Sequence, residues 1–414
     1  MDTLWPELRY TFRRLARSPT TSLAAVITMA LGIGVATGAY SIMDGLMLRG
    51  VSFEDAERLV ALRRTHLRTG RWDAHVPERD FADLRDQQQS LEALIGFRTG
   101  TVNLRDATPR DPVLPERHSG AWVSPGFLDL LRVAPLLGRG FEPTDASAGA
   151  DPVVLIGHHV WQQDYGGATD VVGRTVRVNA RPTTVVGVLP RDFRFPVSQD
   201  VWLPLVLEAH ARPRGEGRHL QVIGRLKDGV PLRRAAEEMS TIARRLGQAY
   251  PETNEDRGLV TRSYVDHVVD SYMGDDGLLM TVAVFGVPAL FVLLIACVNV
   301  TNLLLGRTAA RARELAIRSA LGSGRLRTVS PVLTEAAVSA LAGAVLGVLL
   351  AHWAVRAFGV AMATVEELPY WVSFEVNGRV LFFAAATSVF SALVAGILPA
   401  WRASRPNLRA MLHG

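Results

Sequence analysis

Four long apolar runs dominate the pattern of hydrophobic and polar positions along the chain. They cover residues 21–42, 278–305, 338–355 and 380–400. None contains a charged residue. If the third run is extended back to residue 332, it includes one charged residue, Glu335. A helix rises about 1.5 Å per residue and the bilayer core is about 30 Å thick, so runs of this length are able to cross it. Four such runs are unusual in one soluble domain, and the pattern therefore predicts four transmembrane helices.

The first apolar run also has features of a cleaved signal peptide. Arginines precede it, and Ala36-Thr37-Gly38 loosely resembles a signal-peptidase site. The run is longer than a usual signal-peptide core and continues past the cleavage point, and three further spans follow it. We therefore interpret it as a retained membrane anchor.

Charge divides the segments outside the spans into two groups. Residues 1–20, 306–328 and 401–414 together carry a net charge of +10, whereas the rest of the chain carries −5. Short arginine-rich flanks stay in the cytoplasm, and four spans place all three on one side. The formal net charge of +5, which by itself would suggest nucleic-acid binding, is thus mainly a signal of topology. We expect no nucleic-acid partner.

These observations predict a membrane protein, α-helical with four transmembrane helices, plus a mixed α+β extracytoplasmic domain inserted between helices 1 and 2. The predicted segments are a cytoplasmic N-terminal segment (1–20), helix 1 (21–42), the extracytoplasmic domain (43–277), helix 2 (278–305), a cytoplasmic loop (306–328), helix 3 (329–356), an extracytoplasmic loop (357–379), helix 4 (380–400) and a cytoplasmic tail (401–414). Pro331 is expected in the first turn of helix 3, where proline is tolerated. Pro288 is expected to kink helix 2.

The extracytoplasmic domain has a mixed pattern. Apolar positions at helical spacing predict helices from Pro77 to Leu94 and over 232–250, and Ser124-Pro125 is typical of the start of another helix. Runs rich in β-branched residues predict strands at 153–156, 175–178, 183–188, 220–226 and 260–269. Residues 179–182 are expected to form a hairpin turn.

Few residues point to catalysis. Lys227 is the only lysine and stands outside a GxxxxGK[ST] motif, so the sequence holds no Walker A loop. The glycines at 32–38 lie inside an apolar run, which excludes a nucleotide-binding loop. His158-His159 has no further ligand at metal-binding spacing, and the single Cys297 excludes an intramolecular disulfide and a cysteine zinc cage. We expect no enzymatic activity, no cofactor and no metal site.

Small and amide residues inside the spans are candidates for helix packing. Glycines four residues apart occur in the first and third spans, and two asparagines lie near the cytoplasmic end of the second. Close helix approach favours such glycines, and amides in lipid usually bond to a neighbouring helix. For the asparagines a substrate contact is the alternative. The predicted helix-packing residues are Gly34, Gly38, Asn299, Asn302, Gly343 and Gly347.

The cytoplasmic loop contains a short amphipathic helix with regularly spaced arginines and a glycine stop at 322–324. Such a helix either lies on anionic lipid headgroups or docks a cytosolic partner. Composition alone does not separate these two readings.

Several motifs, in order and at characteristic spacing, make the chain recognisable. They are LRYTFRRLAR (8–17), PLLGRGF (135–141), DFRFP (192–196), DVWLP (200–204), GRLKDG (224–229), ACVNVTNLLL (296–305), RARELAIRSALG (311–322), LTEA (333–336) and PAWR (399–402). With them the chain resembles the MacB/FtsX-like ABC transporter permeases over nearly its whole length. It is most similar to one half of the permeases that are duplicated in acidobacteria.

The resemblance implies a permease subunit in a bacterial inner membrane, with its large domain in the periplasm or outside. It implies a separate ABC ATPase, a second permease copy and mechanical transmission of ATP-driven motion to the outer domain, for export with an adaptor or outer-membrane channel. It also implies that the loop helix couples to the ATPase. The matching coupling residues are Arg311, Arg313, Glu314, Leu315, Ile317, Arg318, Ala320, Leu321 and Gly322.

Two other interpretations remain open. FtsX-like proteins regulate an envelope enzyme and transport nothing, and this chain is compatible with that role. It also shows one permease half and no internal repeat, which fits either a single-unit permease or a degenerate half that acts only as a partner subunit.

Overall fold

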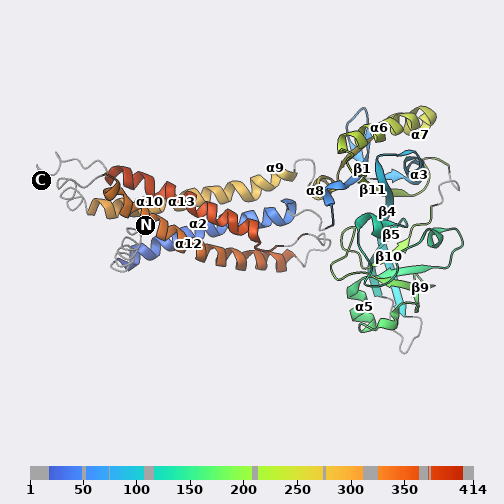
Figure 1. The fold of residues 1–414 in the computed structure, drawn as a ribbon, viewed down its shortest axis with the longest axis horizontal. Helices are drawn as coiled ribbons and strands as arrows, with labels where there is room; N and C mark the ends of the chain where they lie inside the picture. The colour runs from blue at the N-terminus through green and yellow to red at the C-terminus, as the bar shows by residue number, and fades with distance from the viewer. Residues whose placement is uncertain are drawn as a thin grey trace, which may run out of the picture. The chain divides into compact units, whose positions relative to one another are not determined.

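The computed structural model describes most of the 414 residues. The described residues are 18–48, 53–73, 75–106, 116–207, 213–273, 277–310, 325–362, 372 and 374–403. They form two compact units. One unit holds the long helices, and the other holds residues 50–275 with a short segment at 366–372 (Figure 1).

The helical unit is a bundle of four long helices. They are α2 (Pro19–Met43), α10 (Val287–Ala310), α12 (Arg325–Met362) and α13 (Gly378–Ala403). Four helical stretches of the described chain are long and apolar enough to cross a membrane: Pro19–Leu46, Leu279–Ala310, Val332–Met362 and Gly378–Ala400. The predicted four-helix architecture is confirmed.

The core of the bundle consists mostly of small and medium apolar side chains from all four helices. Its buried members are Ala25, Met29, Ile33, Leu293, Cys297, Val300, Leu304, Ala336, Ala344 and Ala395. Large apolar side chains such as Phe382 and Trp353 instead point outward, with exposed fractions of 77% and 72%. A surface of this kind is stable in lipid and costly in water.

The two prolines singled out in the sequence differ in their positions: Pro288 follows an irregular turn, and Pro331 lies inside a long helix. A short helix, α9 (Gly277–Thr281), continues into a π-helical turn, η5 (Val282–Gly286), and α10 begins directly before Pro288. The wide turn accommodates the position where proline cannot donate its backbone hydrogen bond. Pro331 lies inside α12, which already includes Arg325, so the expectation that Pro331 stands in the first turn of the helix is wrong. The apolar stretch able to cross a membrane begins at Val332.

The globular unit is built on one mixed sheet. Its strands are β1 (Leu59–His66), β2 (Trp72–Asp73), β3 (Val76–Pro77), β4 (Leu91–Asp106), β5 (Glu116–Val123), β6 (Leu137–Gly138), β7 (Val153–Ile156), β8 (Thr175–Val178), β9 (Arg181–Val188), β10 (Val201–Pro204), β11 (His219–Leu226) and β12 (Arg257–Ser263). The main order is β12-β1-β11-β4-β5-β10-β7-β9-β6. The pairs β5–β10 and β7–β9 are parallel, and the other neighbouring pairs are antiparallel.

Helices cover the sheet at both ends. They are α3 (Glu78–Gln87), α4 (Phe127–Leu131), α5 (His158–Tyr165), α6 (Leu232–Ala249), α7 (Pro251–Asn254) and α8 (Tyr264–Met273), with short turns η2 (Ala56–Arg58), η3 (Pro143–Ala146) and η4 (Thr169–Val171). Buried residues of α3 and α6 share a core cluster with β1 and β11, whereas α5 packs on β7 and β9 (Figure 1). The predicted mixed α+β domain is confirmed.

Local predictions in this unit succeeded where the turn chemistry was explicit. The β8–β9 hairpin is confirmed: its two turn residues, Asn179 and Ala180, have φ angles of 49° and 68°, as a tight two-residue turn requires. Strands over 153–156 and 220–226 and the helix over 232–250 are also present.

Three local predictions are wrong. The helix predicted from Pro77 to Leu94 ends at Gln87, and Leu94 belongs to strand β4. Apolar residues of α3 and β4 face the same core cluster, and together their positions along the chain imitate the spacing of one long helix. The strand expected to reach residue 269 ends at Ser263, where α8 takes over. Ser124 does not cap α4, because its hydroxyl exchanges hydrogen bonds with the backbone of Gly96 at 3.1 and 2.9 Å.

Candidate functional site

A buried ion pair lies at the end of the bundle where α2 begins, α10 ends and α12 begins, which we call the loop end. The guanidinium of Arg307, in the last turn of α10, pairs with the carboxylate of Glu335 on α12. It also donates hydrogen bonds to the hydroxyls of Thr21 at 2.6 Å and Ser22 at 2.7 Å, both on α2. The Arg307 side chain is 12% exposed and that of Glu335 is 3% exposed. One side chain therefore joins three helices.

The sequence explains why this cluster forms. Glu335 is the only charged residue between residues 332 and 355, and a carboxylate among apolar helices is stable only when it is paired and hydrogen-bonded. Arginine suits the task because its planar fork offers five donors, enough for a carboxylate and several hydroxyls at once. Arg307 itself lies at the start of the predicted cytoplasmic loop, residues 306–328.

Close glycine contacts bind α2 to α12 further along the bundle. A Cβ atom added at Gly34 would lie 3.2 Å from the Cα atom of Gly347, and one added at Gly343 would lie 2.5 Å from the Cβ atom of Met29. Gly38 is less constrained, because an added Cβ would meet Val355 only at 3.9 Å. Without side chains at these positions, the two backbones approach closely enough for extensive van der Waals contact.

The remaining predicted residues are placed differently. The nine predicted coupling residues between 311 and 322 lie outside the described residues. Asn299 and Asn302 are exposed on the outer surface of α10. Within the described bundle they do not face another helix, because α10 turns its Cys297 and Val300 face inward. Their role in helix packing stays a prediction.

Sequence reasoning missed a polar cluster at the opposite end of the bundle. Asp44, fully buried just after α2 in the π-helical turn η1 (Asp44–Leu48), accepts a hydrogen bond from the Asn377 amide at 2.7 Å. The Asn377 side-chain oxygen in turn accepts from the backbone N–H of Val380 at 2.9 Å and so caps α13. Tyr40 stacks on Phe383 nearby, with ring centroids 4.3 Å apart. An aspartate ending an apolar run and an asparagine before another were the available sequence signals.

In the globular unit, a second buried arginine fastens α8 to the sheet. Arg63 on β1 donates from Nε to Nδ1 of His267 at 2.5 Å and from a terminal nitrogen to the His267 carbonyl at 2.7 Å. It also pairs with Asp270 at 3.3 Å and stacks on Trp72. Burial, and then the Arg63 charge, lower the pKa of His267 to about 4. The imidazole is therefore neutral at pH 7, and Nδ1 is the acceptor.

Comparisons with known proteins agree with this architecture. Residues 22–242 match the MacB-like periplasmic core domain, and residues 286–408 match the FtsX-like permease C-terminal region. A probable export ATP-binding/permease protein MacB of Pseudomonas entomophila is 26% identical over 294 residues, which are 68% of this chain and 40% of that protein. A macrolide export ATP-binding/permease protein MacB of Chromobacterium violaceum is 29% identical over 245 residues, 58% of this chain and 35% of that protein. The chain thus spans less than half the length of these relatives.

Solved structures also include similar chains. The periplasmic region of MacB from Actinobacillus actinomycetemcomitans is 13% identical, with a TM-score of 0.37, and covers 52% of this chain and 93% of its own.

The fold and the apolar helices define a multi-pass membrane protein with an α+β extracytoplasmic domain between its first and second spans. The chain belongs to the MacB/FtsX-like ABC transporter permease family, since the first family match alone covers more than half of it and the second covers the remaining spans. The family predicted from the sequence motifs is confirmed.

Proposed function

We propose that this chain is the non-catalytic permease subunit of an ABC transporter of the MacB/FtsX type in a bacterial inner membrane. It receives ATP-driven motion from a separate cytoplasmic ATPase at the 306–328 loop and passes it to the extracytoplasmic domain, for export. Family membership supports the class, and the two curated relatives carry names that combine ATP binding with a permease. The 414-residue sequence contains no Walker A loop, and the proposal therefore assigns ATP hydrolysis to a separate ATPase.

The observation that carries the proposal is the Arg307 cluster at the loop end. Because Arg307 is bonded to α2 and α12 as well as belonging to α10, a displacement of the loop acts on three helices together. The tight glycine contacts between α2 and α12 keep those helices in one register along the bundle. In the globular unit, Arg63 secures α8, the last helix before the second span, to the sheet. Motion therefore has a firm attachment in each unit.

A second permease copy fits the outer surface of α10. Asn299 and Asn302 are exposed among apolar neighbours such as Ile295 and Val298. An amide facing lipid lacks hydrogen-bond partners, and membrane proteins usually place such groups against another helix. A partner permease packed on this face supplies that helix.

Replacement of Glu314 and Arg318 by alanine in the full-length chain tests the proposal. The tagged protein is purified from mildly solubilised membranes of its own organism, and co-purified ABC ATPase and ATP turnover are measured. We expect both to fall by at least about tenfold, because the docking helix loses its charged contacts. The matched control replaces the exposed Arg233–Glu237 pair of α6, whose atoms lie 3.0 Å apart, and should leave both unchanged. Unchanged ATPase recovery and turnover in the Glu314 and Arg318 variant would refute the coupling role.

A further inference from the structure

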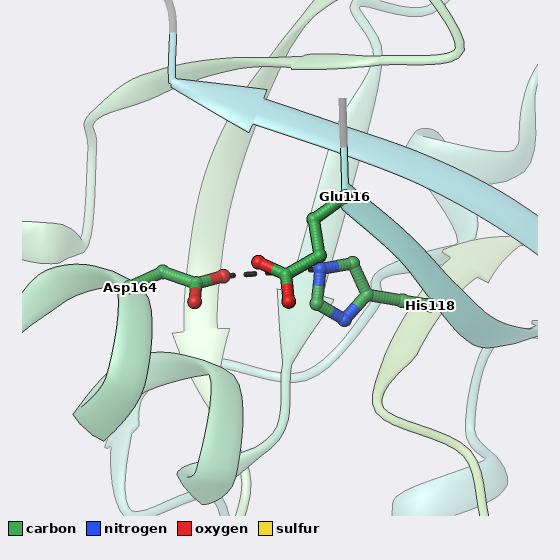
Figure 2. Close-up of side chains that lie close together, drawn as sticks. All are labelled: Glu116, His118 and Asp164. Atoms are coloured by element: carbon green, nitrogen blue, oxygen red, sulfur yellow. Dashed lines mark ion pairs between the residues drawn. The ribbon is translucent and has the colours of Figure 1, made fainter. Parts of the chain in front are cut away.

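Three potential metal ligands converge in the globular unit although they are distant in the sequence. Glu116 and His118 are two residues apart on β5 and so project from the same face of that strand. Asp164 reaches them from α5 (Figure 2). One ligand atom from each residue lies within 4.8 Å of the others.

The imidazole of His118 is the least exposed member of this group. Its side chain is only 10% exposed, and its Nε2 atom is buried without a hydrogen bond to any described residue. The nearest oppositely charged atom is Oδ2 of Asp164 at 3.8 Å, too far for a hydrogen bond. Buried polar atoms normally have partners, and one that has none next to two carboxylates marks a place for an ion or water.

The charges around Asp164 point to a cation rather than a water molecule. The ligand oxygens of Glu116 and Asp164 lie within 4.8 Å of each other and of the His118 nitrogen. Two carboxylates side by side repel each other. A divalent cation between them removes that repulsion and also uses the His118 nitrogen.

We propose that Glu116, His118 and Asp164 form a binding site for a divalent transition-metal ion, with Zn²⁺ the best match. One imidazole nitrogen and two carboxylate oxygens are a typical nitrogen and oxygen donor set for zinc, which leaves a fourth position open to water. Ca²⁺ and Mg²⁺ match less well, because they prefer six or more ligands that are all oxygens. The bound ion would cross-link the start of β5 to α5.

Spacing in the sequence hides this site. Glu116 and His118 are separated from Asp164 by the whole segment from α4 to β7. The adjacent pair His158-His159, which draws attention in the sequence, is used otherwise: His158 packs edge-on against Trp161, with ring centroids 5.4 Å apart.

The test is a titration of the purified full-length chain, freed of metal by a chelator, with Zn²⁺ in a calorimeter. We expect one Zn²⁺ per chain, at least about tenfold weaker binding in His118→Gln and in Asp164→Asn, and unchanged binding in His75→Gln. His75 is a matched control because it forms an exposed pair with Asp73 at 2.9 Å elsewhere in the same unit. Thermal melting without metal verifies that each variant is folded.

Binding of Co²⁺ provides a second measurement, because the visible absorption of this ion depends on its coordination. The wild-type chain should show visible absorption typical of Co²⁺ with few ligands, and His118→Gln should lose it. The proposal is overturned if wild type binds Zn²⁺ no more tightly than the folded His118→Gln and Asp164→Asn variants. It is equally overturned if His75→Gln weakens binding as much, or if Ca²⁺ displaces Zn²⁺ at equal concentration.

Discussion

Replacement of Glu335 by glutamine tests whether the Arg307 cluster holds the bundle together. Glutamine keeps the size of the side chain and removes its charge, which leaves the guanidinium of Arg307 buried without its counter-ion. Removing one partner of a buried pair typically costs ~3–5 kcal/mol. Because Arg307 keeps its hydrogen bonds to Thr21 and Ser22, we expect the lower end, about 3 kcal/mol.

The single cysteine gives this prediction a direct assay. Cys297 is fully buried in the core of the bundle, so a thiol reagent modifies it only when the helices separate. A loss of about 3 kcal/mol raises the equilibrium population of open bundles, and the labelling rate, on the order of 100-fold. The chain is reconstituted in lipid nanodiscs, and modification of Cys297 is followed over time by mass spectrometry.

A double variant distinguishes the ion pair from a general effect of mutation. Replacing both charges, as Arg307→Met with Glu335→Leu, leaves no unpaired charge and should label more slowly than Glu335→Leu alone. Replacing the exposed Arg233 and Glu237 pair should leave labelling unchanged. Labelling of Glu335→Gln at the wild-type rate, or a double variant as fast as the single one, would refute the reasoning.

Three further predictions concern packing, pH and assembly. Gly347→Ala places a Cβ atom 2.9 Å from backbone of α2 and should cost about 1–3 kcal/mol, seen as faster thiol labelling, whereas Gly306→Ala meets nothing within 4 Å and should not. The pKa of His267 is lowered from 6.5 to about 4, so the unfolded state takes up the imidazole proton first as pH falls. The His267 contribution to the stability of the globular unit should therefore be complete above pH 6.5 and be lost, by up to about 3 kcal/mol, as pH falls to 4. Chemical denaturation at a series of pH values measures this decline, which should be missing in His267→Gln. In a Cys297→Ser background, Asn299→Cys should form a disulfide-linked dimer on oxidation in membranes, and a monomer would contradict the proposed dimer face.

The parts of the fold that are set by a local sequence pattern were predictable from the sequence. Long uncharged runs identified the four helices because lipid requires every backbone group to be bonded within its own segment. Turn chemistry identified the β8–β9 hairpin. The boundary between α3 and β4 was not predictable. Phe81 of the helix and Leu91 of the strand are buried in the same core, and their spacing in the sequence does not show that the chain changes from helix to strand between them.

The candidate site was predictable only in part for a similar reason. Glu335 stood out as a lone charge in an apolar run, but its partner Arg307 was one of six arginines in the loop region, and only the fold selects it. Asp44 and Asn377 lie 333 positions apart, and Glu116 and Asp164 also meet only through tertiary structure. Helix-packing glycines follow a spacing rule, whereas the outward direction of Asn299 depends on which face of α10 the other helices occupy.

The most direct test of mechanical transmission measures the extracytoplasmic domains of two paired permeases. A spin label is placed at Leu67, which is 61% exposed, in a Cys297→Ser background, and the complex with its ATPase is reconstituted in nanodiscs. The distance between the two labels is measured by electron paramagnetic resonance with and without ATP. The account predicts a distance distribution that shifts on ATP addition and returns after hydrolysis. An unchanged distribution in a complex that hydrolyses ATP would contradict it.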